Sequence, residues 1–218
     1  MRISSTAASH LVAVALAAGL FAGCSSTTGY EKGAQAGTAM TTSANNITRT
    51  SEQIERTLTA LNELVNNPQP DLRRQFRTFT TEVNNLDSLA RQVSTQAEDM
   101  KSRGATYFGR WSQELAAIQN EDIRNRSEAR QQEVAARFHA IAANYEQTKA
   151  DLQPFMSDLR DVQRFLATDL TPGGIATVKT FATKANEAAV PLRKSLTTLA
   201  DDFRQTGVSL TPTTPAAR

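Results

Sequence analysis

Hydrophobic residues recur in alternating steps of three and four along most of the chain, and polar, proline-containing or glycine-containing breaks divide this pattern into four segments. A seven-residue repeat of this kind is typical of α-helices that pack along a narrow apolar seam. The segments predict helices over residues 40–65, 71–119, 122–170 and 172–207, and the phase of the first segment extends back as far as residue 31. Thr171 and Pro172 predict an N-cap followed by a first helical residue, whereas Pro154 and Pro191 predict a kink and a break inside the third and fourth helices.

The helix lengths predict the shape of the molecule. At 1.5 Å per residue, the second and third helices would each be about 70 Å long, the first about 40–55 Å and the fourth about 50 Å. The first and third turns lie at one end, so the excess length has to project at the other. We therefore expect an all-α fold, an elongated antiparallel coiled coil or four-helix bundle, whose central helical hairpin protrudes by about 20 Å or more.

An apolar run at residues 11–23 follows a single early charge, Arg2. The run is shorter than the about 20 residues that span a bilayer, and its ending in small residues is typical of an export signal. The protein is therefore expected to leave the cytoplasm.

The end of this run, residues 20–24 with the sequence LFAGC, resembles the lipobox of bacterial lipoproteins, although Phe21 stands where leucine is usual. The resemblance implies that Cys24 carries a diacylglyceryl group and that the signal is cleaved just before it. Ser25, in place of aspartate, implies sorting to the outer membrane, where the protein would face the periplasm. A free cysteine near an ordinary cleavage site is the alternative.

These signals divide the chain into four parts. Residues 1–23 are the predicted signal peptide, and residues 24–39 are the lipidated N-terminus and a linker that can include the start of the first helix. Residues 40–207 are the helical bundle. Residues 208–218 are rich in proline and threonine, a composition that predicts a disordered tail.

Composition and motifs give no sign of catalysis. The 24 basic and 22 acidic residues leave a net charge of +2, which provides no basic field for nucleic acid. A single cysteine allows no disulfide framework and no cysteine-built zinc site. His139 has no other histidine or cysteine near it in the mature chain, and no phosphate-binding or nucleophile motif is present. We therefore expect no enzymatic activity, no metal and no cofactor.

Three stretches carry a resemblance to a known family: residues 111–115 (W-x-x-E-L), 123–127 (IRNRS) and 152–166 (LQPFMSDLRDVQRFL). Together they resemble a family of unknown function from Gram-negative bacteria whose members are predicted coiled-coil lipoproteins. The similarity covers most of the mature chain. The resemblance implies a fold and a location, but no activity and no site residues.

Three functions fit these expectations. The first is a structural or interaction protein, a lipid-anchored periplasmic bundle that docks onto a protein of the envelope. The second is a carrier of lipid or another apolar ligand, if small residues in the seams leave room between helices; these are Gly104, Ala182, Ala185 and Ala189. Small residues can equally allow close helix packing. The third is an accessory activator of an envelope enzyme.

Tyr107, Phe108 and Trp111 are the candidate docking patch. They cluster where the predicted first and fourth helices run out, and two helices alone cannot fully cover an indole. In a four-helix section the same residues would belong to the core. Incompletely covered, they would form a surface that favours contact with a partner or with the membrane interface.

Overall fold

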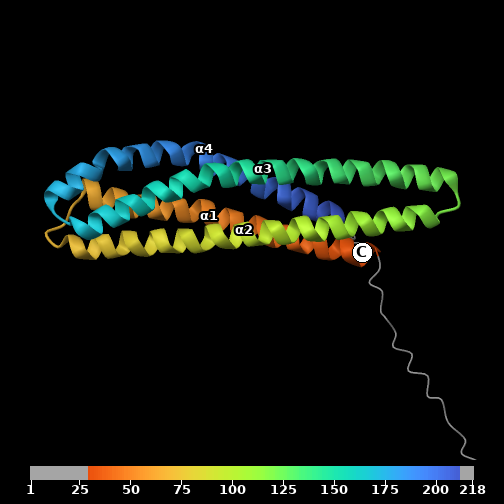
Figure 1. The fold of residues 1–218 in the computed structure, drawn as a ribbon, viewed down its shortest axis with the longest axis horizontal. Coiled ribbons are helices and arrows are strands. Elements are labelled where there is room, and N and C mark those ends of the chain that lie inside the picture. The colour runs from red at the N-terminus through yellow and green to blue at the C-terminus, as the bar shows by residue number, and fades with distance from the viewer. Residues whose placement is uncertain (1–28, 212–218) are drawn as a thin grey trace, which may run out of the picture.

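Each predicted segment folds into one continuous α-helix. The computed structural model describes residues 29–211, and within this range the chain forms four long helices (Figure 1). Their bounds are α1 Gly29–Asn66, α2 Leu72–Ala117, α3 Glu121–Thr168 and α4 Pro172–Leu210. The expectation of an all-α bundle is confirmed. The predicted signal peptide, Cys24 and residues 212–218 lie outside the described range.

Side-chain caps fix where three of the helices begin. Asp71, Asn120 and Thr171 each accept a hydrogen bond from a backbone N–H in the first turn of the helix that follows. Pro172 occupies the first turn of α4, as the sequence predicts. The first residue of each of these helices is therefore set locally, by a side chain that accepts a hydrogen bond from a free backbone N–H group of the first turn.

The prolines inside helices do not interrupt them. Pro154 lies within α3 and Pro191 within α4, and both helices continue through these positions. Proline removes one backbone hydrogen bond, but the residues that follow, Phe155 and Leu192, are buried in the core. Packing on both sides of each proline holds the helix together, so the predicted break at Pro191 is wrong.

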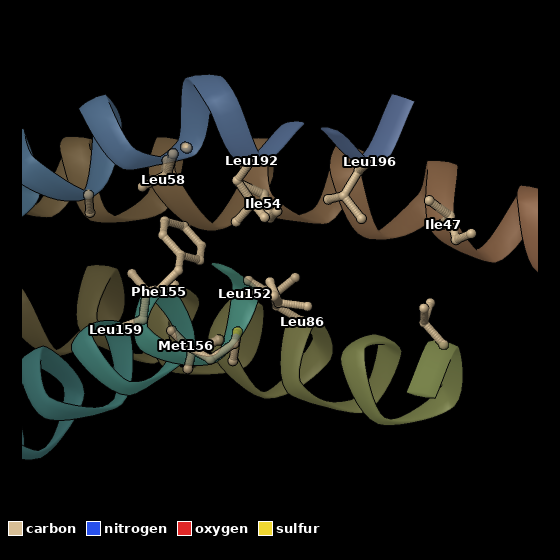
Figure 2. Packing of buried hydrophobic residues seen from close by; sticks show 14 of the residues in the cluster. Ile47, Ile54, Leu58, Leu86, Leu152, Phe155, Met156, Leu159, Leu192 and Leu196 are labelled. Atoms are coloured by element: carbon tan, nitrogen blue, oxygen red, sulfur yellow. The ribbon is translucent and has the colours of Figure 1, made fainter. Parts of the chain in front are cut away.

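The four helices form a closed ring in which each packs against two neighbours: α1 on α2, α2 on α3, α3 on α4, and α4 on α1. The predicted heptad positions face the centre of this ring. Figure 2 shows side chains from all four helices converging there, among them the fully buried Ile54, Leu86, Leu159 and Leu196. A continuous apolar core therefore runs along the bundle.

A second buried stripe on α1 is polar, and the hydrophobic pattern gave no sign of it. It follows the same steps of three and four and consists of Ser43, Asn46, Thr50, Gln53 and Thr57. The stripe meets α2: Gln53 Nε2 donates to the carbonyl oxygen of Glu82 at 3.1 Å, and Thr57 Oγ1 donates to the same oxygen at 3.1 Å. Asn46 Nδ2 donates to Oε1 of Gln96 at 2.7 Å. A shifted pairing would leave the buried side-chain amides of Asn46 and Gln53 without these partners, so the stripe fixes the register between α1 and α2.

Glycines bring α1 and α4 together near the start of α1. A Cβ on Gly37 would stand 2.5 Å from the carbonyl oxygen of Gly207, and a Cβ on Gly207 would stand 2.8 Å from the carbonyl oxygen of Gly37. Only glycine permits this approach of two backbones. Leu210, partly buried, packs against the core. The helix therefore continues past the predicted end at residue 207, and the predicted tail at 208–218 is wrong for its first three residues.

The central hairpin protrudes beyond α1 and α4, as predicted (Figure 1). Tyr107 lies beside Gly33, the fifth residue of α1, and beside the end of α4 at Leu210. Residues 108–117 continue α2 for about 15 Å past the end of α4 and for about 9 Å past the start of α1. The overhang is shorter than the expected 20 Å. The difference arises because α1 already begins at Gly29 and α4 reaches Leu210, so both extend closer to the hairpin end.

The glycine contact between α1 and α4 can be tested with a matched pair of substitutions. We expect Gly37→Ala to lower the free energy of unfolding by about 1–3 kcal/mol, the usual cost of overpacking, because the atom it meets belongs to a backbone. A Cβ on Gly109, also mid-helix, would meet nothing within 4 Å. Gly109→Ala should therefore raise the free energy of unfolding by about 0.5–1 kcal/mol through helix propensity alone. Urea titration measures both, and equal effects of the two variants would contradict the packing.

Candidate functional site

The three residues of the predicted patch lie together on α2 at the base of the overhang. The ring centroids of Tyr107 and Phe108 are 5.3 Å apart, and those of Tyr107 and Trp111 are 5.5 Å apart, both pairs tilted by 59°. All three side chains are half-buried. They are neither a closed core nor fully exposed.

A fourth ring, from α3, completes the group. Phe138 meets Phe108 edge to face, with 5.6 Å between ring centroids. Its ring fills the space left by Gly104, where a Cβ would stand 2.1 Å from Cζ of Phe138. Phe138 is itself buried. We call Tyr107, Phe108, Trp111 and Phe138 the aromatic cluster; the first three form its half-exposed part.

Polar side chains of α3 close the cluster on the hairpin side. The indole Nε1 of Trp111 donates to Oγ of Ser127 at 3.0 Å. Gln131 Nε2 donates to the carbonyl oxygen of Phe108 at 3.1 Å and to Oγ of Ser112 at 2.8 Å. These partners were not predicted from the sequence. In an antiparallel hairpin, residues equally far from the turn lie side by side, and Trp111 and Ser127 are each eight residues from the turn at residue 119. The indole is thus held in one orientation with its N–H already satisfied.

Tyr107 joins the hairpin to the ends of the two shorter helices. A Cβ on Gly33 would stand 3.3 Å from Cε2 of Tyr107 and 3.2 Å from the carbonyl oxygen of Leu210. Burial raises the pKa of the Tyr107 hydroxyl, an effect that the positive charge of Arg130 opposes. Within the described residues this hydroxyl makes no hydrogen bond. Tyr107 is therefore a neutral donor, free for another acceptor, at the edge of the cluster.

Ion pairs line the outside of the hairpin without dominating it. Arg110 pairs with Glu114 along α2, at 2.7 Å, and Glu133 pairs with both Arg130 and Arg137 along α3. These side chains are largely exposed, and such pairs contribute little stability. The hairpin end consequently presents balanced charge around an aromatic centre.

Lys101 and Glu146 tie α2 to α3 at the inner edge of the cluster. The ammonium of Lys101 bonds to the carboxylate of Glu146, which lowers the pKa of Glu146 and raises the pKa of Lys101. Lys101 is partly exposed and Glu146 is exposed, so solvent screens the pair. The ion pair links α2 to α3.

The other candidates from the sequence are placed as follows. His139 is exposed beside Phe138, and residues 29–211 contain no group of three or more potential metal ligands. Ala182, Ala185 and Ala189 are buried in the seam of α4, and the ring of Phe138 occupies the room at Gly104. In the described part of the chain, no helix is both long and apolar enough to cross a bilayer. What the hairpin end can do chemically is bind, through ring faces and one free hydroxyl.

Because Trp111 is only half-buried, removing its side chain should cost less stability than removing a fully buried tryptophan. Trp111→Ala should lower the free energy of unfolding by about 1–3 kcal/mol, less than the about 3–5 kcal/mol of a fully buried tryptophan, because part of the indole already faces water. Phe138→Ala is the matched comparison, since its ring is buried and fills the Gly104 space. We expect the larger loss there, by urea titration. The reverse order would place Trp111 in the core.

Comparison with known proteins gives a family but no function. A family model described as a protein of unknown function (DUF2959) matches residues 23–202. No curated protein and no solved structure matches the chain.

Proposed function

The chain belongs to DUF2959, a family of unknown function, and we propose that it is a non-enzymatic, lipid-anchored component of the bacterial envelope that docks onto a protein partner. In this proposal Cys24 carries the anchor in the outer membrane and the bundle lies in the periplasm. The half-exposed part of the aromatic cluster, Tyr107, Phe108 and Trp111, is the docking surface.

The observation that carries the proposal is that the helices cover the hairpin end only in part. Beyond Tyr107, α4 has ended and only residues 29–32 of α1 still lie beside α2 and α3, so the face that α4 would cover is open and α1 covers only the first turn (Figure 1). Half-exposed aromatic rings at such a place are typical of contact surfaces, because they bury large apolar area at small entropic cost. The rings are also held by Ser127 and Gln131, which prepares them for binding.

The position of the anchor supports the same reading. Only four residues, 25–28, separate Cys24 from the start of α1 at Gly29, and the five Cα–Cα steps between the two span at most about 18 Å when extended. The start of α1 lies at the hairpin end of the bundle (Figure 1). A lipid on Cys24 would therefore keep the aromatic cluster near the membrane surface, within reach of partners embedded there.

Replacing the cysteine tests the anchor. Cys24→Ser should abolish lipid labelling and release the protein from the membrane pellet, because the thiol is the attachment point in the lipobox chemistry. Ser25→Ala is the matched control and should leave labelling unchanged. If the Cys24→Ser variant is still processed at residue 24 and stays membrane-bound, the lipoprotein part of the proposal fails.

Photocrosslinking in the envelope tests the docking surface. A photoreactive residue at Gln113, exposed on the overhang, should give one reproducible adduct, and Phe108→Ala in the same chain should remove it. The control position is Thr180, equally exposed on α4 near the opposite end, which should give no such adduct. An adduct that survives Phe108→Ala, or forms equally from position 180, would contradict docking through the cluster.

A further inference from the structure

The chain leaves α4 beside the aromatic cluster. The carbonyl oxygen of Leu210 and Cε2 of Tyr107 both lie within 3.3 Å of the Cβ position of Gly33. Thr211 then caps the helix in an extended conformation, with φ −85° and ψ 137°, as a residue before proline requires. Residues 212–218 therefore start next to the half-exposed rings.

These seven residues have the sequence PTTPAAR. Proline-rich segments favour the polyproline II conformation, with three residues per turn, and in that conformation Pro212 and Pro215 would fall on one face. At about 3.1 Å per residue the segment reaches about 22 Å, whereas residues 108–117 of the overhang span about 15 Å. The segment is long enough to run along the whole open side of the hairpin.

The cluster has the surface that such a segment needs. Proline-rich segments bind to grooves lined by aromatic rings, because the proline rings pack on the ring faces and the extended backbone offers free carbonyl oxygens. The indole N–H of Trp111 is already satisfied by Ser127, but the hydroxyl of Tyr107 has no acceptor within the described residues. Glu121 and Asp122 in the first turn of α3 lie at the far end of the overhang, within reach of Arg218.

We propose that residues 212–218 bind intramolecularly along the aromatic cluster, with Pro212 and Pro215 packed on Tyr107 and Trp111 and a backbone carbonyl accepting from the Tyr107 hydroxyl. Tethering to α4 gives the segment a millimolar effective concentration, so weak contacts suffice. The regulatory consequence rests on the proposed function: the segment and the docking partner compete for one surface, and a partner has to displace the segment.

Trp111 is the only tryptophan of the chain, so the tryptophan fluorescence reports directly whether residues 212–218 shield its indole from water. In the purified full chain, Pro212→Ser combined with Pro215→Ser should shift the emission to longer wavelength and increase quenching by acrylamide. Thr213→Ser combined with Thr214→Ser is the matched control, because in the proposed conformation these residues would lie on the other faces, and it should change neither the emission nor the quenching. Pro215→Ser alone, which leaves the cap of α4 untouched, should show the same shift in part.

Unchanged emission and quenching in both proline variants would overturn the proposal. So would shielding of Trp111 that depends on protein concentration, since a second copy would then be the cover. The experiment needs neither a membrane nor a partner. A fluorescence shift without an adduct from position 113 would therefore refute the proposed function and leave this inference standing, and the opposite pair of results would do the reverse.

Discussion

The mismatch in helix length governs the rest of the structure. α2 and α3 have 46 and 48 residues, whereas α1 and α4 have 38 and 39. The turns that follow α1 and α3 share one end of the bundle, where residues of both turns line a common groove. The surplus can only appear at the other end. There the seam continues on two helices where four are needed to enclose it, and large aromatic side chains stay half-covered.

A length mismatch has this effect only if the helices cannot slide. The polar stripe of α1 prevents sliding against α2, because the buried amide of Gln53 has to meet Glu82 and that of Asn46 has to meet Gln96. Gly37 and Gly207 do the same between α1 and α4, since any other register would bring a side chain into the contact. Thr171 and the other N-caps fix the turns. The overhang is therefore a set position and its surface is reproducible from molecule to molecule.

Much of this architecture could be predicted from the sequence, because apolar heptads and proline-bearing turns act locally. The polar stripe could not: Ser43 and Asn46 have the composition of a solvated face, and only the neighbouring helix makes them buried. The end of α4 was misplaced for a similar reason, since Gly207 suggests a helix stop until its partner Gly37 is known. At the candidate site, Tyr107 and Trp111 were found by their chemistry and position, whereas Phe138 and Ser127 belong to the opposite helix and required the hairpin register.

The central claim is that residues 112–117 are held by α3 alone while the remainder of α2 is held by the bundle. Native-state hydrogen exchange resolved along α2 measures this directly. The account predicts that amides of residues 112–117 exchange through local opening of low free energy, whereas those of residues 79–100 exchange only with global unfolding. Equal protection along the whole of α2 would contradict it, because the hairpin end would then be as well covered as the core.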